Sequence, residues 1–209
     1  MRTITKTIEI YKFNELSQEA KENAISNYAD TDAYTSDYKA VLEDFCERFN
    51  VNVYKWEVGA YEPISYCTSI NGVEDQELRG LRLRTWIINN IWNDLYEGRY
   101  YSTPFKQVPK SPEHPAGLSY QFRHSRIIME ERCLTGFCAG YTILGAIREF
   151  LDEGWIKYPH KTWEDIVNEC VNDFFLSWRG DLEYAVSEDG FEEFCEGNEY
   201  EFTADGRMY

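Results

Sequence analysis

The sequence predicts an α+β protein in which a small antiparallel sheet packs with about five helices. Hydrophobic residues make up 43% and aromatic residues 16% of the 209 positions, enough to bury a sizeable core. Segments with the two-residue period of a strand lie near both ends and in the first third of the chain. Segments with the helical period lie between them. We therefore expect a single α+β domain over residues 1–209.

The first expected elements follow this periodicity. Apolar residues alternate over residues 3–11, which predicts an amino-terminal strand. Ser17 is placed to cap a helix, and a second helix is expected from about Ser36. Residues 51–58 and 64–70 then predict two central strands.

The middle of the chain changes in character. Apolar residues at intervals of three and four predict a helix over residues 77–96. Four of the six prolines fall in residues 98–118, which predicts a long irregular loop of the kind that often carries function. Residues 120–133 are expected to be extended.

The last part of the chain predicts three helices and a hairpin. A short helix is expected over residues 141–151, and Thr162 with Asp165 resembles a capping box at the start of the longest helix. Ser187 is placed to begin a last short helix that ends at Gly197. Asp-Gly within residues 200–209 predicts a hairpin, which we expect to pair with residues 3–11 of the same chain.

Charge is distributed unevenly. Residues 1–78 hold 15 acidic and 7 basic residues, residues 79–132 hold 5 and 9, and residues 133–209 hold 17 and 5. Such a field repels nucleic acids and membrane surfaces and attracts basic proteins, although it can also serve solubility alone. The start of the chain lacks the apolar run of a secretory leader, and no run reaches the length of about 18 residues that spans a membrane. We therefore expect a cytoplasmic protein whose six cysteines are reduced.

Two ends of the sequence resemble a known family. The segments are KTIEIYKFNELSQEAKENA at residues 6–24 and NEYEFTADG at residues 198–206, with a further similarity at residues 135–138. They resemble small acidic proteins of unknown function that bacteriophages and other mobile elements carry. The resemblance implies an accessory gene acting in the cytoplasm of a bacterial host, and it supplies no catalytic residues.

Catalytic and metal-binding signals are weak. Cys133 lies near two arginines and could form a nucleophile with His124 as its base, but a structural cysteine at the end of a strand explains the same pattern. The cysteines never occur as C-x-x-C, no calcium-loop pattern is present, and no glycine-rich phosphate loop occurs. We therefore expect a binding protein that is not an enzyme and that carries no metal or other cofactor.

Acidic side chains near the carboxyl end are the main candidate for a partner-binding surface. On the longest helix they recur every four residues, a rise of about 6 Å, and a second row on the last helix lying beside it would approach the charge density of a DNA duplex. We hypothesise an anti-defence inhibitor that occupies the nucleic-acid site of a host effector of the CRISPR-nuclease or restriction type. The candidate residues are Asp165, Glu169, Asp173, Asp181, Glu183, Glu188, Asp189, Glu192, Glu193, Glu196, Glu199 and Glu201.

Two alternatives remain open. The basic central region, with its many aromatic residues, could bind a nucleotide signal molecule and sequester it. Its candidate residues are Arg79, Arg82, Arg84, Arg123 and Arg126. The acidic chain could also neutralise a basic toxin in the manner of an antitoxin.

Overall fold

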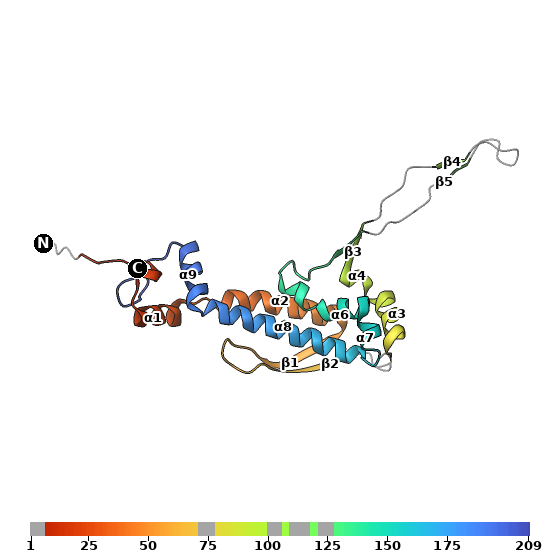
Figure 1. Ribbon diagram of the computed structural model, residues 1–209, viewed down its shortest axis with the longest axis horizontal. Coiled ribbons are helices and arrows are strands. Elements are labelled where there is room, and N and C mark those ends of the chain that lie inside the picture. Colours follow the sequence, from red (N-terminus) through yellow and green to blue (C-terminus); the bar gives the residue numbers. More distant parts are fainter. Residues whose placement is uncertain (1–6, 71–77, 100–105, 109–117, 121–127) are drawn as a thin grey trace.

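The computed structural model describes residues 7–70, 78–99, 106–108, 118–120 and 128–209. Its longest element is helix α8 (Trp163–Ala185), which runs along the body of the molecule (Figure 1). Buried residues form two separate clusters, one around α8 and one beyond its carboxyl end. We call residues 7–30 together with 184–209 the small lobe, and the described residues between them the large lobe.

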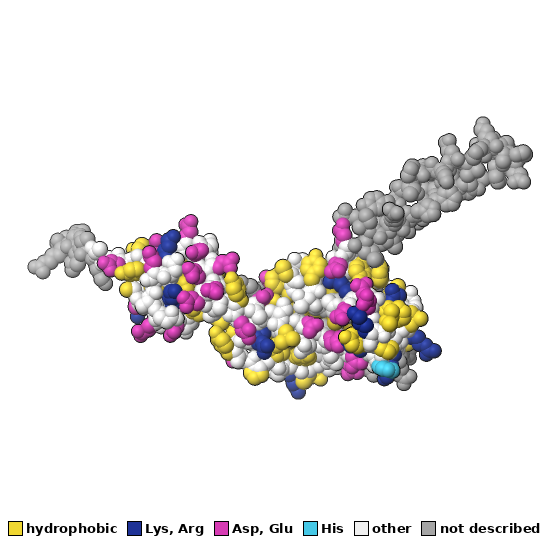
Figure 2. Space-filling model, viewed as in Figure 1, with side chains coloured by type: hydrophobic (Ala, Val, Ile, Leu, Met, Phe, Trp, Pro, Cys, Tyr) yellow, Lys and Arg dark blue, Asp and Glu magenta, His cyan; other side chains and the backbone are white. Residues whose placement is uncertain are grey.

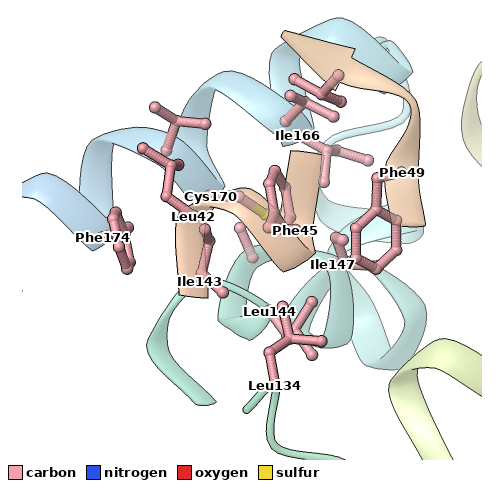
Figure 3. Packing of buried hydrophobic residues seen from close by; sticks show 14 of the residues in the cluster. Leu42, Phe45, Phe49, Leu134, Ile143, Leu144, Ile147, Ile166, Cys170 and Phe174 are labelled. Carbon is pink, nitrogen blue, oxygen red and sulfur yellow. The ribbon is translucent and has the colours of Figure 1, made fainter. Parts of the chain in front are cut away.

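The core of the large lobe forms where three helical segments meet. Helix α2 (Asp32–Phe49) packs on one side of α8, and the short helices α5 (Ala139–Thr142) and α6 (Gly145–Glu149) pack on another. Figure 3 shows Phe45 of α2, Ile147 of α6 and Cys170 of α8 converging on one buried point. The capping box predicted for α8 is confirmed, because Thr162 Oγ1 accepts from the Asp165 amide and the Asp165 carboxylate accepts from the Thr162 amide.

A two-stranded antiparallel sheet covers another face of α8. Strand β1 (Val51–Glu57) pairs with β2 (Ser65–Ile70), with Val51 opposite Ile70 and a bulge between Tyr54 and Glu57. The ring of Tyr66 stacks on Phe175 of α8 with a centroid separation of 5.1 Å. Both central strands were predicted to within a residue or two of their observed ends.

The α+β class is confirmed, but the strands are grouped differently from the single sheet that the sequence predicted. Besides β1–β2, the described strands form the separate pairs β3–β6 and β4–β5, and isolated bridges join Tyr11 to Phe202 and Phe202 to Met208. The bounds are β3 (Tyr96–Arg99), β4 (Lys106–Val108), β5 (Leu118–Tyr120) and β6 (Ile128–Glu131). The chain ends pack instead into a cluster of their own, separate from the cluster that β1–β2 joins.

The remaining helices differ from the predictions mainly at their ends. Helix α2 begins at Asp32, before the expected Ser36, and the helix expected over residues 77–96 is divided at Ile91 into α3 (Gly80–Asn90) and α4 (Trp92–Leu95). The helix expected over residues 141–151 is a series of α5, α6, the π-helical turn η3 (Phe150–Gly154) and α7 (Trp155–Lys157). The loop predicted at residues 98–118 contains β4, and most of its other positions lie outside the described residues.

The small lobe joins the two ends of the described chain. It contains the 3₁₀ turn η1 (Phe13–Glu15), helix α1 (Gln18–Tyr28), helix α9 (Glu188–Gly197) and the carboxyl-terminal hairpin. Tyr11 and Phe202 exchange both backbone hydrogen bonds at 2.8 Å, so the predicted pairing of the hairpin within its own chain is confirmed. Of the expected amino-terminal strand, residues 7–10 have no partner strand among the described residues, and residues 1–6 lie outside them.

Candidate functional site

The small lobe holds a cavity of about 550 Å³ at the junction of the two chain ends. Phe13 forms its buried floor, where the ring packs edge-on against Phe191 with centroids 5.0 Å apart. Helix α9 and the segment after it form the opposite wall. The lining residues are Lys12, Phe13, Asn14, Glu192, Cys195, Glu196, Glu199, Tyr200 and Glu201.

Four of the predicted acidic residues surround this cavity. Glu192 and Glu196 stand one helical turn apart on α9, and Glu199 and Glu201 follow on the chain that leaves the helix. Glu199 adopts a left-handed conformation with φ of 57°, which turns the chain back over the cavity. Within the part of the chain that the structure describes, no ion pair involves any of these four carboxylates. Their charges therefore face Lys12 as the single basic residue of the lining.

Other predicted acids of the small lobe have local partners. Lys21 of α1 binds the Glu188 carboxylate, and this hydrogen bond lowers the pKa of Glu188. Glu193 accepts from the hydroxyl of Tyr184 at 2.7 Å. Asp189 lies exposed in the first turn of α9, where a negative charge stabilises the helix dipole.

The whole small lobe is strongly negative. Residues 7–30 and 184–209 contain 13 acidic and 3 basic residues, so this lobe holds most of the net charge of −16. Figure 2 shows carboxylates spread over the visible face of the small lobe, with few Lys or Arg side chains among them. Burial of Cys195 beneath this surface raises the pKa of its thiol to about 11, so the thiol stays neutral next to Glu192.

The acidic residues of α8 do not join this site. Asp165, Glu169 and Asp173 lie in the first half of α8, whereas α9 lies beyond its carboxyl end (Figure 1). Asp173 is about 18 Å along the helix axis from Ala185. The expected pair of adjacent acidic rows is therefore absent from these two helices, because α9 continues past the end of α8 and does not fold back beside it.

Several acids of α8 serve the fold. Asp165 caps its own helix, and Lys161 binds Glu169. Asp181 accepts a hydrogen bond of 2.5 Å from the buried hydroxyl of Tyr38, and Glu183 pairs with Arg179 at 3.4 Å. Asp173 is exposed and has no cationic partner among the described residues.

The basic residues expected to bind a nucleotide are spread apart. Arg84 donates Nε to the carbonyl of Leu151 at 2.9 Å, and its guanidinium lies over the Trp155 ring. Arg79 and Arg82 are exposed at the amino-terminal end of α3. The pKa of Asp165 is lowered first by the hydrogen bond from the Thr162 backbone and then, to a smaller extent, by the charge of Arg79. Arg123 and Arg126 lie outside the described residues.

The catalytic alternative gains no support from Cys133. Its thiol donates to the carbonyl of Phe137 at 2.8 Å, and desolvation raises its pKa, whereas a nucleophilic cysteine needs a lowered one. His124, the proposed base, lies outside the described residues. Over the described ranges, no three His, Cys, Asp or Glu side chains are grouped to hold a metal ion, and none of the described helices is long and apolar enough to cross a membrane.

Comparisons with protein families, with curated proteins and with solved structures found no match to this chain. The site therefore rests on its own geometry. Sequence reasoning identified Glu192, Glu196, Glu199 and Glu201 but missed Lys12, Phe13, Asn14 and Tyr200. One signal pointed to these residues: the two distinctive segments, residues 6–24 and 198–206, are the ones that meet in the small lobe.

Proposed function

We propose that this chain is a phage or mobile-element inhibitor that binds a basic, nucleic-acid-binding defence protein in the cytoplasm of a bacterial host. The small lobe docks on the partner's nucleic-acid site and excludes the nucleic acid. The partner is of the CRISPR-nuclease or restriction type. The observation that carries the proposal is the set of four carboxylates that surround the small-lobe cavity and have no ion-pair partner among the residues that the structure describes.

The cavity suits a basic side chain of the partner. The half-buried ring of Tyr200 in its lining offers surface for the aliphatic stem of an arginine or lysine. The surrounding carboxylates accept hydrogen bonds from the charged head, and an arginine can bind a carboxylate with two parallel bonds. A basic nucleic-acid site presents such side chains in number.

The charge of the lobe supports mimicry of a phosphate backbone. Successive carboxylates on one face of α9, such as Glu192 and Glu196, are about 6 Å apart along the axis. Binding them to a basic groove releases the counterions of both surfaces, as DNA binding does. The field also steers the two proteins together, and this attraction weakens as salt increases.

Binding to purified restriction and CRISPR effectors tests the proposal. We expect affinity to fall at least about tenfold between about 50 and about 500 mM salt, and duplex DNA to compete with the protein. The double change Glu192→Lys/Glu196→Lys is expected to weaken binding at least about tenfold. Its matched control is Glu43→Lys/Glu47→Lys, which makes the same reversal at the same spacing on the exposed face of α2.

Other results would contradict this function. If binding affinity does not change with salt, the acidic small lobe is not the docking surface. The same conclusion follows if both double variants lose the same amount of affinity. If the effector binds DNA and this protein at the same time, the small lobe does not occupy the nucleic-acid site, and mimicry is contradicted. Exclusive binding to a basic toxin supports the antitoxin alternative, and a rise in melting temperature with millimolar nucleotides supports the nucleotide alternative.

A further inference from the structure

The outer edge of strand β2 has no partner strand among the described residues. The amide of Val53 on β1 donates to the sulfur of Cys46 on α2, so that amide points away from β2. Val53 lies opposite Thr68, which makes this a non-hydrogen-bonded pair of the antiparallel ladder. The backbone N–H and C=O of Thr68 therefore point outward from β2, as do those of Tyr66 and Ile70 two residues away.

This edge lacks the features that usually prevent strand addition. The six residues of β2 read Ser-Tyr-Cys-Thr-Ser-Ile and include no charged residue and no proline, in a chain that is 28% charged. None of the six is buried. The edge of β1, in contrast, lies against α2, and β1 carries the bulge.

The free edge borders an exposed stripe of α8. Tyr66 stacks on Phe175 and Thr68 donates to Asn168 at 2.6 Å, and these two α8 residues are separated by about 20° around the helix. Trp56 of β1 contacts Trp178, about 60° to the other side of Phe175. Continuing past β2, the next α8 side chains are all exposed or half-exposed; in order around the helix they are Arg179, Asn172, Asp165, Glu183, Leu176, Glu169 and Asp173. Arg179 pairs with Glu183.

We propose that the free edge of β2 binds an extended basic segment of a partner protein as an added strand. The outward N–H and C=O groups of Tyr66, Thr68 and Ile70 pair with its backbone. Alternate side chains of the added strand face the α8 stripe, where a lysine or arginine stem can lie on Leu176, which is 44% exposed. Its charged head then meets Asp173, which has no cationic partner among the described residues. This site lies on the large lobe and is independent of the proposed function of the small lobe.

Two synthetic peptides test the proposal on the full chain. Each is a capped peptide of about eight residues; one alternates valine with lysine and the other valine with glutamate. We expect only the lysine peptide to bind, and we expect it to slow hydrogen exchange at the amides of Tyr66, Thr68 and Ile70. The variant Glu192→Lys/Glu196→Lys is expected to bind it equally well, which separates this site from the small lobe.

Variants of β2 and α8 give the decisive comparison. Thr68→Pro removes an outward N–H without removing a ladder bond to β1, so it is expected to weaken binding at least about tenfold. Thr68→Ala, which loses only the hydroxyl bond to Asn168, is expected to keep binding. Asp173→Lys is expected to weaken binding of the lysine peptide without altering β2. This variant tests the proposal if Thr68→Pro does not fold.

The proposal fails if the lysine peptide does not bind at millimolar concentration, or if it slows exchange only in α9. It also fails if Thr68→Pro folds and binds like Thr68→Ala, or if the glutamate peptide binds as well as the lysine peptide. Protection of the β2 amides in a dimer of the protein without peptide would assign the edge to a second copy of this chain and overturn the proposal.

Discussion

Tyr38 of α2 combines a stacking contact and a polar contact in one buried side chain. Its ring lies 5.1 Å from that of Trp178, with the two planes 7° from parallel, and its hydroxyl donates to the carboxylate of Asp181. Burial, and then the hydrogen bond to Asp181, raise the pKa of Tyr38. Asp181 was a candidate for partner binding, and here it fastens α2 to α8.

Replacing Tyr38 by phenylalanine tests this link. We expect Tyr38→Phe to lower the free energy of unfolding by about 1–3 kcal/mol, because the half-buried Asp181 carboxylate loses its donor. Urea denaturation at neutral pH measures the change. An unchanged free energy of unfolding would show that water or Ser177 replaces the hydroxyl at no cost.

The raised pKa also predicts an alkaline effect. The folded protein holds the Tyr38 proton above the pH of about 10 at which the unfolded chain releases it. Stability from this group is therefore fully present below about pH 10 and is lost as the pH rises further. We expect the stability difference between the wild-type protein and Tyr38→Phe to shrink above that pH, and a constant difference would contradict the assignment.

Gly206 is required where the carboxyl-terminal hairpin touches α1. A Cβ at this position would lie 2.1 Å from the carbonyl oxygen of Ala20, and φ is +81°. We expect Gly206→Ala to lower the free energy of unfolding of the small lobe by at least about 2 kcal/mol, because backbone must move and a left-handed residue is strained. Faster hydrogen exchange in α1 and α9 would report this.

A glycine in the same lobe provides the control. No atom lies within 4 Å of a Cβ built at Gly197, the last residue of α9, and its φ is not positive. We expect Gly197→Ala to leave exchange in α1 and α9 unchanged or slower. If Gly206→Ala and Gly197→Ala changed hydrogen exchange in α1 and α9 equally, the close contact with Ala20 would not be the reason that residue 206 must be glycine.

At the scale of elements, Arg148 of α6 fixes the β3–β6 pair to the large lobe. It is 8% exposed, and its guanidinium donates to the carbonyls of Arg132, Leu95 and Tyr141 and pairs with Glu131 at 3.1 Å. Leu95 directly precedes β3, Glu131 and Arg132 lie at the end of β6, and Tyr141 belongs to α5. A single buried cation therefore satisfies backbone groups at the point where the two strands leave the helices.

Replacing Arg148 by a neutral residue is expected to weaken the attachment of the β3–β6 strand pair to the large lobe. Arg148→Met should lower the free energy of unfolding by about 1–3 kcal/mol, because the carbonyls of Arg132 and Tyr141 lose the Arg148 donor. Hydrogen exchange in β3 and β6 should accelerate more than in α2 or α8. Arg148→Lys keeps the charge but not the planar fork, so an intermediate effect is expected, and equal exchange in all elements would contradict a local role.

At the scale of the whole molecule, charge is concentrated where the chain ends meet. The small lobe places 13 acidic and 3 basic residues around a core of seven buried side chains, whereas residues 31–183 hold 24 acidic and 16 basic residues. Like-charge repulsion therefore opposes folding of the small lobe more than that of the large lobe. The acidic surface that attracts a partner also destabilises the lobe that carries it.

Salt is expected to stabilise the small lobe selectively. Raising ionic strength from about 10 mM to about 150 mM shortens the screening length from about 30 Å to about 8 Å. Hydrogen exchange in α1 and α9 should slow, with a smaller change in α2 and α8. The effect should be weaker in Glu192→Lys/Glu196→Lys, and equal salt dependence in both lobes would contradict this account.

The sequence by itself determined the α+β class, the two central strands, and the starts of α1, α8 and α9. Each depends on a local signal: alternation in β1 and β2, or a side chain such as Thr162 or Ser187 that caps the backbone three residues on. The sequence also identified the carboxylates of the cavity. It did not locate the break at Ile91, where φ is −126°, because the apolar pattern of residues 77–96 continues through that position.

Only the tertiary structure decided which acidic residues act together. Asp165, Asp181 and Glu192 look alike in sequence, yet one caps a helix, one accepts from a buried tyrosine and one faces a cavity. The structure also decided that the chain ends form a lobe of their own and that one edge of β2 has no partner strand within the described ranges. These outcomes depend on contacts between residues far apart along the chain, such as Tyr11 with Phe202, which no local pattern encodes.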